Sequence, residues 1–156
     1  MSYRFRKARP EDVLLYFEYR NEEGVRANSI SKEPISLENH KNWFLTNLDN
    51  PNRIFYVLEN DESPIGQLRF DIEDNSATIN YSIDRKFRGQ GLGNYIIEQG
   101  IEELKKEMGN LRIIIAKVIP SNIPSCKIFE KLGFKIVDEE SVKGVRLFCF
   151  QKKLSV

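Results

Sequence analysis

The sequence has few of the residues from which metal centres and disulfide frameworks are built. Its 156 residues include one histidine, His40, and two cysteines, Cys126 and Cys149. One histidine excludes a poly-histidine metal centre, and the cysteines have neither a C-x-x-C spacing nor a neighbouring histidine. We therefore expect no metal ion, and we interpret both cysteines as reduced packing residues.

An excess of one charge and long apolar runs are also missing. The chain has 24 Lys+Arg against 23 Asp+Glu, a formal net charge of +1, so no overall field attracts nucleic acid or an anionic membrane. No stretch approaches the roughly 20 apolar residues of a membrane helix, and the start, MSYRFRKARPED, lacks the apolar segment of a secretory signal. We expect a cytoplasmic protein without nucleic-acid or membrane partners, in which any anion is bound locally.

The length and the order of the hydrophobic patterns predict one α/β domain over residues 1–156, with a mixed sheet. In the helix expected after Pro10, the residues at helical spacing are Val13, Leu14, Phe17 and Arg20. The segment 21–34 that follows reads as a loop or a broken helix. The remaining patterns predict strands at 3–7, 53–59, 64–71, 76–83, 111–118, 134–138 and 146–154, and helices after Ser36, over 92–108 and between Asn122 and Gly133.

A glycine-rich turn, Arg88-Gly89-Gln90-Gly91-Leu92-Gly93, separates a predicted strand from the longest predicted helix. A helix N-terminus offers unpaired N–H groups and a partial positive charge, and glycines let a diphosphate approach them without a Cβ in the way. No Lys-Ser or Lys-Thr pair follows, which excludes a P-loop, and the position after a meander of strands argues against a Rossmann unit. The turn is a candidate diphosphate site of another kind, with a purely structural connection as the alternative.

Two motifs in this chain resemble those of the GNAT superfamily of N-acetyltransferases. The first, Arg/Gln-x-x-Gly-x-Gly/Ala, is matched by Arg88, Gly91 and Gly93, with a lead-in at Ile83 and Phe87. The second, on the late helix, is matched in register by Asn122, Ser125, Phe129, Lys131, Gly133 and Phe134. The resemblance implies an α/β GNAT fold, with a mostly antiparallel seven-stranded sheet, four helices and a splayed central strand pair.

The resemblance also implies that acetyl-CoA is the cosubstrate. Its pyrophosphate would lie on the backbone amides of the turn and its pantetheine between the splayed strands. Asn122 can equally be a helix cap, and Ser125 can be a packing residue. The residues carried over as cofactor-binding are Ser82, Ile83, Asp84, Arg88, Gly89, Gln90, Gly91, Leu92, Gly93, Asn94, Asn122, Ser125 and Phe129.

In this superfamily a neutral amine attacks the thioester directly, without a covalent enzyme intermediate, and many members protonate the departing thiolate with a late-helix tyrosine. This chain has Phe129 at that position. Candidate donors are Tyr81, Ser82 and Tyr95, a water molecule, or none, because a thiol of pKa about 8.5 is a modest leaving group.

The N-terminal third carries acceptor specificity in the superfamily, and here it is unusually polar. Its Arg-Asn, Val-Arg, Ser, His and Trp-Phe pattern, with Gly66-Gln67-Leu68-Arg69-Phe70 later, resembles the nucleotide-sugar branch. In particular it resembles the N-acetyltransferases of pseudaminic acid biosynthesis, which acetylate the 4-amino group of a UDP-linked amino sugar. The acceptor residues implied are Arg20, Asn21, Arg26, Ser29, His40, Trp43 and Arg69.

On this reading the arginines meet a diphosphate, Trp43 stacks on a uracil or sugar face, and the polar side chains bind hydroxyls. Solvated charges and packed aromatic rings are the alternative, and His40 is alternatively a general base or a buried, hydrogen-bonded side chain. Other possible acceptors are a protein N-terminus and a polyamine. A non-catalytic acetyl-CoA-binding module is the alternative from a different class. The chain is expected to be a monomer or a homodimer.

Overall fold

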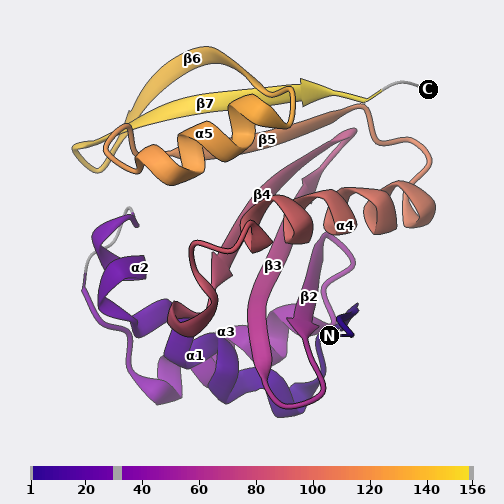
Figure 1. Cartoon of the computed structure of the whole chain (residues 1–156), viewed down its shortest axis with the longest axis vertical. Coiled ribbons are helices and arrows are strands. Elements are labelled where there is room, and N and C mark those ends of the chain that lie inside the picture. Colours follow the sequence, from indigo (N-terminus) through magenta and orange to yellow (C-terminus); the bar gives the residue numbers. More distant parts are fainter. Residues whose placement is uncertain (1, 30–32, 155–156) are drawn as a thin grey trace.

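The computed structural model describes residues 2–29 and 33–154 (Figure 1). Its centre is a seven-stranded sheet in the order β1-β2-β3-β4-β5-β7-β6, in which β4 and β5 are parallel and all other neighbours are antiparallel. The mixed, mostly antiparallel sheet that was predicted is therefore confirmed. The strands are β1 (Arg4–Lys7), β2 (Arg53–Glu59), β3 (Pro64–Glu73), β4 (Ser76–Ile83), β5 (Ile113–Val118), β6 (Lys135–Val142) and β7 (Val145–Lys153).

The described residues form five α-helices, one more than predicted. The additional helix is α2, within the segment expected to be a loop or a broken helix. Its five residues are too few for a hydrophobic period to show, and the carboxylate of Glu22 caps its first turn by accepting the N–H of Val25 at 3.1 Å. The helices are α1 (Val13–Asn21), α2 (Glu23–Ala27), α3 (Leu37–Leu48), α4 (Leu92–Glu107) and α5 (Ile123–Lys131), with short 3-10 helices at Pro10–Asp12 and Arg85–Phe87.

Alternate residues of the central strands face two different helical layers, because successive side chains of a strand point to opposite faces. Leu68 and Phe70 of β3 belong to the core that α4 and α5 complete. Phe55 and Val57 of β2 face the opposite way, into a smaller core with α1 and α3. In Figure 1, α4 and α5 cross in front of the sheet, α1 and α3 lie at the bottom of the view, and α2 lies at its left.

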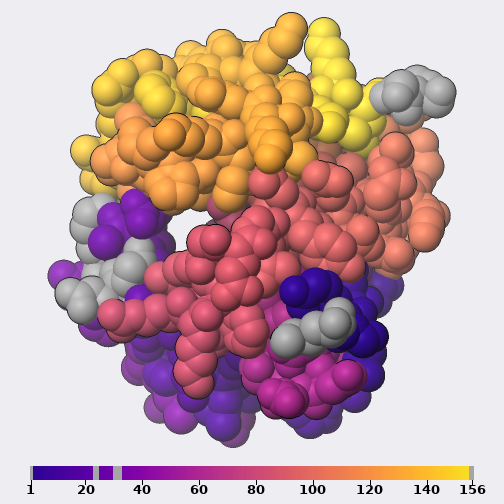
Figure 2. Space-filling model, in the orientation of Figure 1, coloured from indigo at the N-terminus to yellow at the C-terminus, as the bar shows by residue number. Residues whose placement is uncertain are grey.

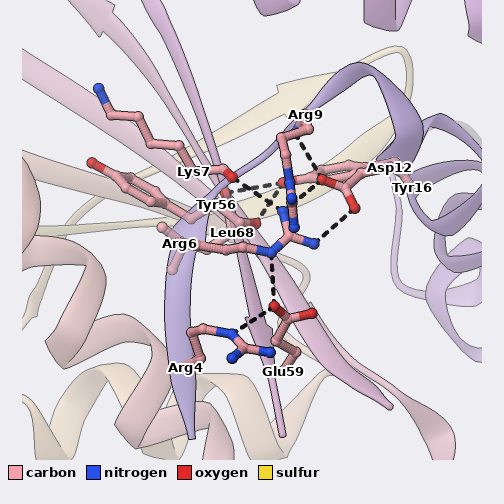
Figure 3. Close-up of polar contacts among 9 residues, drawn as sticks. All are labelled: Arg4, Arg6, Lys7, Arg9, Asp12, Tyr16, Tyr56, Glu59 and Leu68. Carbon is pink, nitrogen blue, oxygen red and sulfur yellow. Dashed lines mark hydrogen bonds and ion pairs between the residues drawn. The ribbon is translucent and has the colours of Figure 1, made fainter. Parts of the chain in front are cut away.

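Tyr16 holds α1 to the sheet. Tyr16 and Tyr19 are its buried residues, whereas Leu14, one of the residues at the predicted spacing, is 54% exposed. The Tyr16 hydroxyl donates to the carbonyl of Tyr56 in β2 at 2.7 Å (Figure 3). A buried tyrosine needs such a partner, which sequence spacing does not reveal. The contact fixes α1 so that its last turn, with Tyr19 and Arg20, borders the cavity described below.

A network of charges fixes the entry to α1 at the edge of the sheet (Figure 3). Arg6 of β1 forms ion pairs of 2.8 Å with both Asp12 and Glu59, and Arg4 shares the Glu59 carboxylate at 3.0 Å. Because Glu59 belongs to β2 and Asp12 immediately precedes α1, the network joins two strands and a helix into one unit.

The strands β4 and β5 separate after a short paired stretch. They pair only from Ser76 to Thr78 of β4 with Ile113 to Ile115 of β5. The rest of β4, up to Ile83, is paired with β3 on its other side but not with β5. The central pair is therefore splayed, as predicted, and the gap opens toward the ends of both strands.

Candidate active site

A cavity of about 740 Å³ passes through the gap between β4 and β5. Tyr81 and Ile83 border it from the face of the sheet that carries α4 and α5, and Asn80 and Ser82 border it from the opposite face. Figure 2 shows its opening between α5 (orange), the segment leading into α4 (red) and the N-terminal helices (purple). We call the part beside α4 and α5 the turn half, and the part beside α1, α2 and α3 the acceptor half.

The glycine turn forms one end of the turn half. Gly89 and Gly91 have φ angles of +78° and +76°, a region that favours glycine, and no atom lies within 4 Å of the position of an added Cβ. Gly91 caps α4 without a side-chain hydrogen bond, and the helical bonding begins with the N–H of Tyr95. The N–H groups of Leu92, Gly93 and Asn94 thus lack partners within the helix. All three residues line the cavity, so the turn fits a diphosphate.

Gly93 has a second function, which is to let two helices meet. A Cβ added there would lie 2.7 Å from the Cδ1 atom of Ile128 in α5. Gly93 therefore allows α4 to approach α5 at the edge of the cavity.

Arg88 ties the turn to the N-terminal helices. Its Nε donates to the carbonyl of Ile83 at 3.0 Å, and its Nη2 forms an ion pair of 2.7 Å with Glu22, between α1 and α2. The Arg88 charge is therefore partly neutralised by Glu22, which leaves the backbone amides as the main diphosphate ligands that the turn offers.

Residues of α5 complete the turn half. Asn122 lines the cavity, and its Oδ1 accepts the N–H of Ser125 at 3.4 Å, so capping and cavity lining coexist in one residue. The hydroxyls of Ser125 and Tyr81 share a hydrogen bond of 2.6 Å that links α5 to β4. Burial raises the pKa of Tyr81, so its hydroxyl stays protonated at neutral pH.

Four of the residues predicted for the cofactor or for catalysis do not line this cavity. Tyr95 is 36% exposed and its ring lies 5.5 Å from that of Tyr3, so its position does not support a role as proton donor. Phe129 is buried between Phe134 and Phe150 in the core. The other two are Asp84, whose carboxylate caps the 3-10 helix, and Gln90, which is exposed.

Polar side chains of the sheet form the floor of the acceptor half. The Nε2 of Gln67, in β3, donates to the Oδ1 of Asn80 at 3.1 Å and to the Oγ of Ser82 at 3.0 Å. Gln67 is only 6% exposed. Sequence reasoning missed Gln67 and Asn80 as site residues. The signal was their alternation with Leu68 and Ile79, which turns them to the face opposite the main core.

Two of the residues predicted to bind the acceptor, Asn21 and Arg26, do not line the cavity and instead hold the segments around the acceptor half in place. The side-chain amide of Asn21 makes two hydrogen bonds to the backbone of Ile35. Its Nδ2 donates to the carbonyl of Ile35 at 3.0 Å, and its Oδ1 accepts the N–H of Ile35 at 2.9 Å. The Nε of Arg26 donates to the carbonyl of Asn21 at 3.0 Å. Neither Asn21 nor Arg26 lines the cavity, because both side chains hold the segments around α2 together. Ser29 does line it, while its hydroxyl donates to the carbonyl of Val25 at 2.6 Å.

His40 lies in the wall of the acceptor half as a buried side chain. It is 1% exposed and its ring stacks on Phe44 at 5.9 Å. Its Nε2 lies 3.1 Å from the carbonyl of Val13, which fixes this nitrogen as the protonated donor. Burial lowers the pKa of His40, so the ring is neutral at neutral pH. The geometry gives it a clear structural role, the attachment of α3 to α1.

Trp43 lies in the acceptor half under a group of arginines. The guanidinium carbons of Arg69, Arg20 and Arg53 lie 5.2, 5.4 and 5.6 Å from the centre of its ring, within the range of cation–π contacts. The predicted stacking of Trp43 on a uracil would have to displace these groups. The geometry instead gives the indole the role of a platform for arginines.

The charges along the cavity have one sign. The described residues that line it include Arg20, Arg69, Arg88 and Lys127, and they include no aspartate and no glutamate. No group of three or more His, Cys, Asp or Glu in residues 2–29 and 33–154 could hold a metal ion, and no helix there is long and apolar enough to cross a membrane. The cavity therefore suits anionic or neutral groups better than cationic ones.

A glycine turn at a helix N-terminus, at the open end of a splayed strand pair, is the arrangement that the resemblance to acetyl-CoA-dependent acetyltransferases implied. The sequence matches the family model "Acetyltransferase (GNAT) domain" over residues 3–135. The chain accordingly belongs to the GNAT family of N-acetyltransferases.

Two proteins with similar sequences are also named as acetyltransferases. YwnH of Bacillus subtilis (strain 168), provisionally named as a phosphinothricin acetyltransferase, is 28% identical over 109 residues, which cover 65% of this chain and 64% of YwnH. YokL of the same strain, an uncharacterized N-acetyltransferase of prophage origin, is 26% identical over 132 residues, which cover 83% of this chain and 73% of YokL. The match thus spans about two thirds of YwnH and somewhat more of YokL.

Among solved structures, spermidine N-acetyltransferase from Vibrio cholerae, in complex with CoA and spermine, has a TM-score of 0.86 at 16% identity. The match covers 97% of this chain and 95% of that one. At such identity the likeness shows the GNAT fold, and the acceptor of this chain has to be inferred from its own cavity.

Proposed function

We propose that this GNAT-family member transfers the acetyl group of acetyl-CoA to the 4-amino group of a UDP-linked amino sugar. The observation that carries the proposal is the acceptor half of the cavity, which combines Arg20 and Arg69 with hydrogen-bonding side chains and has no carboxylate among its described lining residues. A nucleotide sugar offers hydroxyls for the polar side chains and a diphosphate for the arginines.

The same observation argues against a polyamine acceptor. A polyamine carries several positive charges, and binding it would require carboxylates to offset their desolvation and the repulsion from Arg20 and Arg69. The sequence offers the runs Glu22-Glu23 and Asp71 to Asp74 for this purpose. Asp71, Glu73 and Asp74 do not line the cavity, and Glu22, which does not line it either, pairs with Arg88. A protein N-terminus is the second candidate acceptor, and the assay below includes it.

The residues of the turn half fit acetyl-CoA, with the amides of Leu92, Gly93 and Asn94 toward its diphosphate and Asn122 beside the gap between the strands. When bound, acetyl-CoA supplies an activated acetyl thioester. Tyr81 carries its hydroxyl proton on the turn-half side of β4; a tyrosine is protonated at neutral pH at its ordinary pKa of about 10, and burial raises the pKa of Tyr81 further. We propose Tyr81 as the proton donor in place of the missing late-helix tyrosine. Ser82 is the other candidate whose side chain reaches the cavity.

The acceptor half also acts on the protonation of the amine. Positive charges nearby disfavour an ammonium and lower its pKa. A sugar amine beside electron-withdrawing oxygens is already less basic than a lysine, whose pKa is about 10.4. More of such an amine is neutral and nucleophilic at neutral pH, which reduces the need for a strong general base.

The test is to follow free-thiol release from acetyl-CoA against UDP-linked 4-amino sugars, spermidine and short peptides, with product masses confirmed. Turnover of a sugar nucleotide with a kcat/KM at least about tenfold above the other acceptors is the expected result. Turnover confined to spermidine or to peptides would refute the sugar proposal, and acetyl-CoA binding without any turnover would point to a non-catalytic module. The single-domain organisation of residues 1–156, the cytoplasmic location and the monomeric or homodimeric state stay predictions.

A further inference from the structure

Three guanidinium groups gather on the indole of Trp43, and two of them share one carboxylate. Asp71 forms ion pairs with Arg69 at 3.0 Å and with Arg53 at 3.5 Å. Arg20 has no ion pair with any residue that the structure describes. The group therefore carries more positive charge than Asp71 can neutralise.

Arg20 is the most exposed member of this group, although part of its side chain is buried, and Arg69 is its neighbour. Burial and the charge of Arg69 lower the pKa of Arg20, as expected for two guanidinium groups held close together. Their mutual repulsion is unfavourable in the empty cavity and is relieved when an anion lies between or beside them. Both residues line the acceptor half, whereas Arg53 does not.

We propose that Arg20 and Arg69, held on the Trp43 ring, form a binding site for the anionic oxygens of the acceptor. The inference rests on the proposed function in one respect, that the acceptor enters this half of the cavity. The planar guanidinium groups suit phosphate and carboxylate oxygens alike. A diphosphate would come from a nucleotide sugar, and a carboxylate would come from an amino-acid-like acceptor.

The proposal explains why an aromatic platform lies beneath the arginines. The Trp43 ring also packs edge-on against the buried Phe55 at 5.8 Å, so the indole is fixed to the sheet side of α3. A fixed ring keeps flexible arginine side chains close to one another, which reduces the conformational entropy lost when an anion binds. The anion site is thus partly organised before the acceptor arrives.

Trp43 also provides the readout, because it is the only tryptophan in the sequence. The protein is first saturated with CoA, so that the glycine turn is occupied, and is then titrated with inorganic pyrophosphate, or with succinate, at constant ionic strength. Tryptophan fluorescence, excited at a wavelength where CoA does not absorb, and calorimetry give the two dissociation constants. A lower Kd for pyrophosphate identifies a phosphate site, and a lower Kd for succinate identifies a carboxylate site.

The decisive variant is Arg20→Gln, with Arg53→Gln as the matched control. Both arginines lie on the same indole, but only Arg20 lines the cavity. We expect the Kd for the preferred anion to rise about tenfold or more in Arg20→Gln, because one charge-assisted hydrogen bond to the anion is lost. In Arg53→Gln the Kd should stay within about twofold of the wild-type value. Arg20→Lys keeps the charge but not the planar fork, and it should give an intermediate value. Absence of anion binding by both methods, or an unchanged Kd in Arg20→Gln, overturns the proposal.

Steady-state kinetics distinguishes a failure of the anion-site proposal from a failure of the proposed function. If a UDP-linked sugar is acetylated but its KM is unchanged in Arg20→Gln, the anion site is refuted and the sugar proposal stands. If no UDP-linked sugar is acetylated but Arg20→Gln still loses anion binding, the anion site stands with a different acceptor.

Discussion

Replacing Tyr81 by phenylalanine tests the proposed proton donor, because the change removes one hydroxyl and leaves the ring in place. The ring packs edge-on against Phe129 at 5.9 Å, a contact that phenylalanine preserves. If the hydroxyl protonates the departing thiolate, kcat should fall by about 10²–10⁴-fold, the usual contribution of a general acid. Affinity for acetyl-CoA, measured by titration, should change little.

The control is Ser125→Ala, which breaks the same 2.6 Å hydrogen bond from the other side. Each variant leaves one part-buried hydroxyl without its partner, which costs up to about 1–3 kcal/mol of stability. Both should therefore show similar losses in denaturant unfolding, while only Tyr81→Phe loses the large factor in kcat. Equal effects of the two variants on kcat would refute the role of Tyr81 and reduce the pair to a packing contact.

The pH dependence gives a second check. Burial raises the pKa of Tyr81 above its ordinary value of about 10, so its hydroxyl remains protonated throughout the neutral range. The wild-type kcat should show no decline from this group between pH 7 and about pH 9.5. A decline in that range that disappears in Tyr81→Phe would show that Tyr81 titrates lower than its burial implies, while leaving it as the acid.

Three further predictions concern the turn and the only histidine. Gly91→Ala places a side chain at φ +76° and should cost about 1–2 kcal/mol of stability and raise the Kd of acetyl-CoA. Gly144→Ala, at φ +79° in the turn between β6 and β7, should lose similar stability in thermal unfolding with an unchanged Kd. Glu22→Gln removes the ion pair with Arg88 and should lower the Kd of acetyl-CoA by up to roughly fivefold, an effect that fades at high salt. Because the folded pKa of His40 is lowered, the unfolded chain binds the proton first, and stability should decrease as pH falls below about 6.5. His40→Gln should flatten that slope in denaturant midpoints measured against pH.

Local patterns were enough to predict the strands and the glycine turn. The alternation in β2, β3 and β4 and the run of apolar residues in β5 arise from how each strand packs, so they are visible in short windows of sequence. The turn could be located in the same way, because the positive φ angles at Gly89 and Gly91 require glycine whatever the rest of the fold does.

The contacts that could not be predicted from the sequence are those between residues far apart in the chain. Asn21 was predicted to bind the acceptor, but its amide is used by Ile35, 14 residues away, through both of its hydrogen-bonding atoms. Tyr16 is buried in preference to Leu14 because its hydroxyl reaches a carbonyl of β2. Residue type alone does not indicate which polar side chain finds a partner within the protein and which stays available to a ligand.

The charge of the cavity carries information about the acceptor that the fold does not. The chain resembles spermidine N-acetyltransferase over almost its whole length, with a TM-score of 0.86, and that protein was solved with spermine bound. The same backbone arrangement can nevertheless serve different acceptors, because the backbone places the gap and the turn, whereas side chains on one face of α1, α3, β3 and β4 set the local potential. In this chain those positions hold Arg20, Trp43 and Arg69, and no described lining residue supplies a negative charge to hold a polyamine. Introducing a carboxylate by Arg69→Glu should therefore weaken the binding of anions and begin to admit spermidine, and a variant that gained neither property would show that the acceptor is selected elsewhere.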